Sequence, residues 1–201
     1  MLSRFDGRIC GLGTTSGLRV VVGIWSQSPL GSFADAMVET PQGHRVLLAP
    51  SEQVAAFVAA TYSFDEVLVT PVAIEQGEDW WRLDSTVLTA SWTLGERSWI
   101  GHVLRLVPAP VRTARWWARL CDPVARRLMP GVRTYGTAGG GRTEWYAARD
   151  AWTVRSARVT FRGEPAGALA PLDPPVRFGF GSAPRVPTHT ALSSFVDAPA
   201  T

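Results

Sequence analysis

Short runs of β-branched and alternating apolar residues recur along most of the chain, and they predict a protein built mainly of strands. The connection PQG at 41–43 suits a tight hairpin, with a glycine where positive φ is needed. Pro71 places its strand at an edge or a bulge. The predicted strands are 18–25, 35–40, 44–50, 66–74, 80–95, 99–107, 144–149, 152–163 and 177–182.

Two segments carry a helical pattern instead. Ser51 is a suitable N-cap for a helix over 52–62. A second helix over 110–129 begins at a proline and is expected to kink or split at Pro123. Its arginines mostly avoid the apolar side, so we expect that side to face the sheet and a basic face to point outward. The apolar stripe consists of Trp117, Leu120, Cys121, Val124 and Leu128.

Many strands and few helices, without a β-α-β rhythm, predict a mainly β fold of the α+β class. We expect a closed or strongly curved antiparallel β-barrel with two or three outer helices. Within RFGFGS at 177–182, Phe178 and Phe180 alternate with glycines, so this strand is expected to close the barrel with both rings inside. The chain is long enough for one substantial core, and we expect a single domain over 1–201.

No apolar run approaches the length of a membrane-spanning helix, so we expect no stable membrane insertion. The start MLSRFDGRICGLG has no apolar stretch of the length that a signal peptide needs, which favours a cytoplasmic protein.

The composition excludes several chemistries. All twenty basic residues are arginine, and without lysine the chain can form no imine with a carbonyl substrate or pyridoxal phosphate. Two cysteines and three histidines without ligand spacing predict no metal site. GLGTTSG at 11–17 precedes a strand rather than a helix, so it is interpreted as a turn and not as a phosphate-binding loop. We therefore expect no cofactor.

Charge is distributed unevenly. Residues 32–84 hold nine acids and two arginines, whereas residues 97–133 hold eight arginines and one acid, Asp122. The basic segment could face nucleic acid or anionic lipid. Alternatively, the two segments meet in the folded chain or in a homodimer, and this interpretation is favoured because charge runs on helices are usually solvated faces. We expect no nucleic-acid partner.

The segment GGGRTEWY provides the sharpest candidate site. On a strand, Arg142, Glu144 and Tyr146 point to one face, where they could bind and polarise a carboxylate or carbonyl group. A cross-strand salt bridge would explain the same pattern.

Nine tryptophans provide further candidates, because such rings line ligand pockets as well as cores. Trp80 and Trp81 are adjacent, so one of them should face inward and the other outward. Trp81 and Trp117 are the candidates for a pocket wall, Arg133 for an anion contact and His102 for an assisting catalytic group.

Three stretches resemble the acetoacetate decarboxylase-like superfamily: PLGSF at 29–33 with AMVETPQGHRVLLAP at 36–50, SEQVAAFV at 51–58, and ARVTFRGEPAGALAPLDPPVRFGFGSAPRVP at 157–187. They are more similar to an uncharacterised bacterial branch than to the decarboxylases themselves. The resemblance implies a cone-shaped barrel with outer helices and a largely apolar cavity. The family's founding members decarboxylate a β-keto acid through a lysine imine, and this chain has no lysine to provide it.

Three hypotheses follow. The first is a small-molecule-binding protein whose Trp- and Arg-lined cavity accepts an apolar carbonyl or carboxylate ligand. The second is a lysine-independent lyase or hydrolase with Glu144 as acid/base, Arg142 or Arg133 as anion contact, and His102 or Tyr146 assisting. The third is an interaction protein that docks through the basic helix 110–129.

Overall fold

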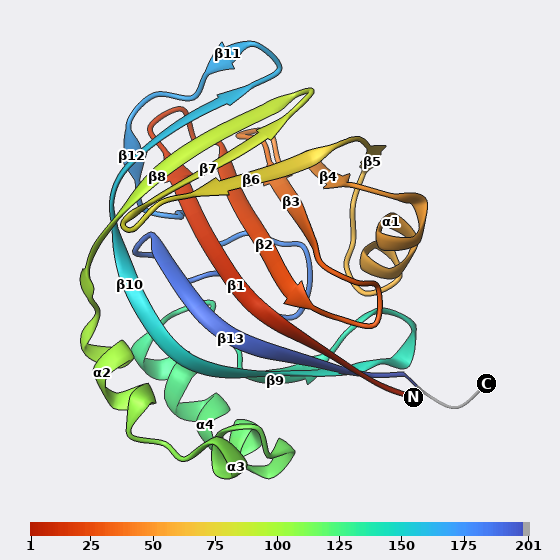
Figure 1. Cartoon of the computed structure of the whole chain (residues 1–201), viewed down its shortest axis with the longest axis vertical. Helices are drawn as coiled ribbons and strands as arrows, with labels where there is room; N and C mark the ends of the chain where they lie inside the picture. Colours follow the sequence, from red (N-terminus) through yellow and green to blue (C-terminus); the bar gives the residue numbers. More distant parts are fainter. Residues whose placement is uncertain (199–201) are drawn as a thin grey trace.

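A single strongly curved sheet dominates the computed structural model, which describes residues 1–198 (Figure 1). Ten strands follow one another in the order β5-β4-β3-β2-β1-β13-β10-β8-β7-β6, and three short strands pair beside this path. All pairings are antiparallel except that of β4 with β5. The long strands are β1 (Leu2–Thr14), β2 (Arg19–Gln27), β3 (Phe33–Glu39), β8 (Leu88–Arg97), β10 (Thr143–Phe161) and β13 (Thr188–Asp197). The shorter ones are β4 (Arg45–Ala49), β5 (Glu66–Val69), β6 (Val72–Gln76), β7 (Trp80–Ser85), β9 (Tyr135–Thr137), β11 (Glu164–Pro165) and β12 (Leu169–Ala170).

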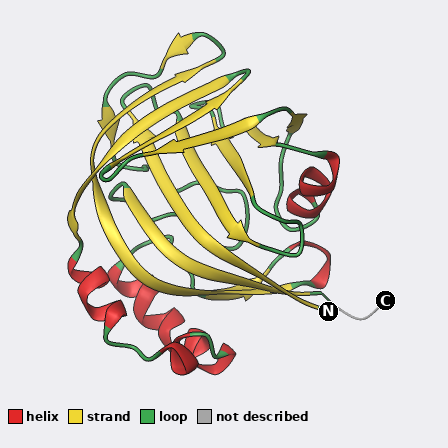
Figure 2. Cartoon of the chain, in the orientation of Figure 1, coloured by secondary structure: helices red, strands yellow, loops and turns green. Residues whose placement is uncertain are grey.

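The helices lie outside this curved sheet (Figure 2). In the described chain they are α1 (Glu52–Ala59), α2 (Trp99–Arg105), α3 (Ala109–Arg112) and α4 (Arg115–Leu128), with a short 3-10 turn at Gly139–Gly141. The expected strongly curved antiparallel sheet with outer helices is thus confirmed, with one helix more than predicted. No helix of residues 1–198 has the length and apolar character that crossing a membrane requires.

The main core fills the inside of the curved sheet. Alternate residues of β1 and β2 point into it, among them Leu12 and Val22, and meet Leu83 and Trp92 from the opposite side of the barrel. The predicted opposite orientation of the two tryptophans of β7 is confirmed, because Trp81 is 6% exposed and Trp80 is 43% exposed.

Several local predictions are also confirmed. Ser51 caps α1 by accepting a hydrogen bond from the Val54 backbone N–H at 3.3 Å. The hairpin between β3 and β4 turns at PQG, where Gly43 has a φ of 86°. Pro71 separates β5 from β6, and these two strands stand at the two ends of the strand order. The proline thus interrupts pairing where the sheet has its edges.

Other predicted strands differ from the structure in type or in bounds. The strand predicted over 99–107 was wrong, because residues 99–105 form α2, which the Ser98 hydroxyl caps by accepting from the Gly101 N–H at 3.1 Å. The stretch 80–95 is split by a turn between β7 and β8, and the predicted strands 144–149 and 152–163 are one strand, β10, whose pairing shifts register at bulges. The helix predicted over 110–129 breaks between α3 and α4, whereas α4 continues through Pro123.

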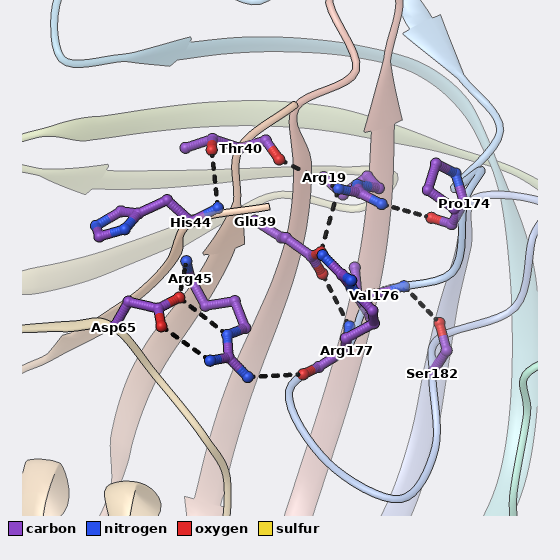
Figure 3. Close-up of polar contacts among 10 residues, drawn as sticks. All are labelled: Arg19, Glu39, Thr40, His44, Arg45, Asp65, Pro174, Val176, Arg177 and Ser182. Atoms are coloured by element: carbon purple, nitrogen blue, oxygen red, sulfur yellow. Dashed lines mark hydrogen bonds and ion pairs between the residues drawn. The ribbon is translucent and has the colours of Figure 1, made fainter. Parts of the chain in front are cut away.

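The segment RFGFGS at 177–182 is not a barrel strand. It belongs to a connection that covers the outer face of β1 and β2, where Phe178 packs against Val21 and Leu172. A buried ionic cluster holds this connection in place (Figure 3). Glu39 is fully buried and accepts from the backbone N–H of Arg177 at 2.8 Å and from its side-chain Nε at 3.0 Å, while Arg19 lies 3.3 Å from the same carboxylate. Arg19 also donates to the Pro174 carbonyl at 2.8 Å.

Candidate functional site

A pocket of about 530 Å³ is lined by residues of β1, β2, β3, β6, β7 and β10 and of the loop before β3. Its size is that of a cavity for a small molecule. The lining residues combine aliphatic and aromatic side chains with polar ones, and two arginines contribute the only formal charges among them. Those residues are Gly7, Arg8, Ile24, Trp25, Ser26, Ser32, Phe33, Ala34, Val72, Ile74, Gln76, Trp81 and Arg149.

Arg8 is the unusual group of this pocket. Its guanidinium stacks on the rings of Trp81 and Trp152, 5.4 and 5.6 Å from their centroids. Partial burial and the nearby charge of Arg149 lower the pKa of Arg8, whereas Asp150 acts in the opposite direction. Asp150 is already bonded to Arg97, whose Nε donates to it at 2.9 Å. Within the described part of the chain, Arg8 therefore has no carboxylate of its own.

Below these tryptophans lies a buried histidine. His189 is fully buried and accepts a hydrogen bond at Nδ1 from the Trp92 indole N–H at 3.3 Å. Its ring lies 4.8 Å from that of Trp81. Burial, with Arg8 adding to it, lowers the pKa of His189 to about 3, so the imidazole is neutral in the folded protein. His189 therefore adds no positive charge beside Arg8.

Glu144 and Tyr146 lie on the other face of the sheet. Ser194 donates to Glu144 at 2.9 Å, and Ser194 is five residues from His189 on β13, so the two point to opposite faces. Tyr62 donates to Glu144 at 2.7 Å and lies 2.9 Å from the Tyr146 hydroxyl. Burial raises the pKa of Glu144, although these hydrogen bonds oppose the effect. Glu144 is 1% exposed, which leaves it no direct contact with solvent.

The remaining candidate residues line neither the pocket at Arg8 nor the hydrogen-bonded cluster of Glu144 and Tyr146. Arg142 donates to the Thr61 hydroxyl at 2.8 Å and thereby contacts the end of α1. Arg133 forms a two-pronged bond with Asp122, with 3.0 Å from Nε to each carboxylate oxygen. His102 is exposed on α2, and Trp117 packs edge-on against Trp116 on α4. Of the predicted residues, Trp81 alone lines the pocket.

Arg8 and Arg149 were not among the residues predicted from sequence. Arg8 belongs to β1, which was not predicted, and Arg149 falls at the end of one predicted strand, next to the bulge between Ala148 and Asp150. The signal that remained was their residue type, because the planar guanidinium of arginine suits the binding of a carboxylate. Within residues 1–198, His, Cys, Asp and Glu side chains form no group of three or more that could hold a metal ion.

No family model matches the sequence, and no curated protein matches it either. Among solved structures, the chain is similar to acetoacetate decarboxylase from Legionella pneumophila, with 10% identity and a TM-score of 0.44 over 98% of this chain and 85% of that one. It is also similar to a Nitrosomonas europaea protein assigned to AttH, with 10% identity and a TM-score of 0.25 over 99% of this chain and 52% of that one. The first of these proteins is an acetoacetate decarboxylase, the family to which the three sequence stretches are similar. Both similarities concern the path of the backbone alone.

Proposed function

We propose that the protein binds a small molecule with a carboxylate head and an apolar body in the pocket lined by Arg8, Arg149 and Trp81. The observation that carries this proposal is the half-buried Arg8, which faces the pocket without a carboxylate partner among the described residues. An anionic ligand group would supply that partner and would relieve the repulsion between the two guanidinium groups.

The pocket walls support the apolar half of the ligand. Ile24, Val72 and Ile74 lie on strands from opposite sides of the mouth, and Trp81 provides a large flat surface beneath Arg8. Apolar side chains beside polar groups that fix the orientation of a ligand are found together in small-molecule sites. Binding in the pocket depends neither on an acid/base role of Glu144 nor on a cytoplasmic location.

Calorimetric titration with octanoate and with octanol tests the proposal, because the two probes share a chain and differ in the charged head. We expect octanoate to bind at least tenfold more tightly, and Arg8→Gln to weaken it by about 10- to 100-fold, as for the loss of a hydrogen bond to a charged group. Arg155→Gln is the matched control, because Arg155 is an exposed arginine of β10 that does not line the pocket. Equal binding of both probes, or unchanged octanoate binding by Arg8→Gln, would refute the proposal.

A further inference from the structure

Large apolar side chains are exposed mainly on the helices α2 and α4. Seven of the thirteen exposed large hydrophobic residues in the described chain lie within 99–128. Trp99 and Val103 lie on α2, and Leu106, which is 81% exposed, is its C-cap residue. On α4 they are Trp116, Leu120, Val124 and Leu128. The residues on α4 are spaced four apart and therefore form one continuous row along the helix. We call these seven residues the apolar row.

The apolar row on α4 corrects the prediction that the apolar stripe faces the sheet. The helix instead buries Ala118, Asp122 and Ala125. Asp122 fixes this rotation, because its carboxylate accepts from the Arg133 side chain and from the Thr134 backbone N–H at 2.9 Å. The Thr134 hydroxyl also donates to the Ala118 carbonyl at 2.7 Å. Turning the stripe inward would break all of these bonds, so its exposure is built into the packing.

Unpaired positive charge accompanies the apolar row. Five arginines of the helical region make no ion pair within residues 1–198, namely Arg105, Arg112, Arg119, Arg126 and Arg127. The only acid between residues 97 and 133, Asp122, is buried and bonded to Arg133. No ion pair of the described chain joins the acidic segment 32–84 to the basic segment 97–133. The charge of this surface is therefore not neutralised from within the fold.

We propose that α2 and α4 dock the protein flat on an anionic lipid bilayer, with the apolar row in the headgroup region and the arginines on the lipid phosphates. The three helices α2, α3 and α4 all contact β10 and gather at one corner of the molecule (Figure 1), so they can meet a plane together. Long arginine side chains can lay their stems on the apolar surface while their heads reach phosphate. A high share of arginine beside Trp, Leu and Val is typical of helices that lie in the membrane interface without spanning it.

Charge also distinguishes this occupant from a second copy of the chain. A symmetric dimer through the apolar row would bring the same patch from both subunits together, and with it two sets of unpaired arginines. Like charges brought face to face in an interface cost free energy. An anionic membrane surface attracts the same arginines and accepts the apolar row at the same time.

Vesicle flotation tests the proposal with the full chain. The probes are vesicles of phosphatidylcholine alone and of phosphatidylcholine with phosphatidylglycerol in equal amounts. We expect the protein to float with the anionic vesicles and much less with the neutral ones. Arg126→Gln/Arg127→Gln should weaken the anionic binding by about fivefold for each arginine. Leu120→Gln/Val124→Gln should weaken it at least tenfold, because both apolar groups leave the interface.

Matched controls separate docking from folding. Val67→Gln/Val69→Gln changes two exposed valines on β5, each 44% exposed, and Arg155→Gln/Arg158→Gln removes two exposed charges from β10. Both should float like the wild type, and all variants should keep its melting temperature within a few degrees. The proposal is overturned by equal binding to neutral and anionic vesicles, or by unchanged binding of the Leu120/Val124 variant. A dimer that this variant dissociates, without vesicle binding by the wild type, would instead assign the surface to self-association.

Discussion

Asp35 is expected to make the stability of the protein fall as pH rises from about 4 to 7. Its carboxyl is 3% exposed and has one side-chain partner, the Trp25 indole N–H, which donates to it at 3.0 Å. Burial raises the pKa of Asp35 from 3.8 to about 7, although the bond from Trp25 opposes this effect. Folding thus favours the protonated form of this side chain.

The pH window follows from these two pKa values. Below about pH 4 both the folded and the unfolded chain hold the proton, and the group contributes no pH dependence. Between pH 4 and 7 the unfolded chain has lost the proton that the folded chain keeps, so the free energy of unfolding falls by about 1.4 kcal/mol per pH unit. Above about pH 7 the loss levels off near 4 kcal/mol.

Asp35→Asn removes this term and keeps an oxygen that can accept from Trp25. The measurement is urea unfolding followed by circular dichroism for both proteins from pH 4 to 8. We expect the free energy of unfolding of the variant, minus that of the wild type, to increase by up to about 4 kcal/mol over this range. Any constant cost of the amide cancels in this comparison. Asp84→Asn, at an exposed carboxylate, should show no such trend. Parallel curves for Asp35→Asn and wild type would contradict the argument.

Two further perturbations test the packing around the pocket and the outer connection. Glu39→Gln should lower the free energy of unfolding by about 3–5 kcal/mol, because it leaves the buried Arg19 without a countercharge. Urea unfolding measures this loss. The control variant Glu164→Gln, at an exposed site, should cost less than about 0.5 kcal/mol. Gly7→Ala should cost about 1–3 kcal/mol, because a Cβ there would overlap the backbone carbonyl of Ile24. At Gly31 a Cβ would have no neighbour within 4 Å, although φ there is 82°. Gly31→Ala should therefore cost about 1–2 kcal/mol. A larger loss at Gly31 than at Gly7 would show that overlap with Ile24 does not decide the outcome.

The sequence was sufficient for the strands with the strongest β signal. The run LRVVVGIW gave β2, and HRVLLAP gave β4, because β-branched and aliphatic residues are buried there on both faces. The two central strands β1 and β13 were missed. β1 contains three glycines, Asp6 and two arginines, and β13 is rich in Ser and Thr. Their neighbours on both sides hold them in the sheet, and pairing between distant segments leaves no local trace in the sequence.

Missing these strands also determined how much of the site could be predicted. Trp81 was found because alternation in β7 is local and depends on no partner. The face of Arg8 could not be assigned without β1, and the bulge beside Arg149 interrupts the alternation of β10. Glu144 and Tyr146 were correctly placed on one face of a strand, but which face of the sheet this is depends on the register of β10 with β13.

Pairing with carboxylates distinguishes most structural arginines from those available to a ligand, although Arg149 of the pocket also lies 4.0 Å from Asp6. Of the twenty arginines, twelve make an ion pair within residues 1–198, including Arg19 and Arg177 at Glu39 and Arg133 at Asp122. Five of the other eight lie on the helical surface, and one more is Arg8 in the pocket. A guanidinium stays charged at any working pH, so an arginine without a carboxylate partner can bind an anion. The same chemistry therefore supports both proposals. Their surroundings differ, because one site is a pocket and the other an exposed apolar row, and they predict a small carboxylate in one place and a lipid surface in the other.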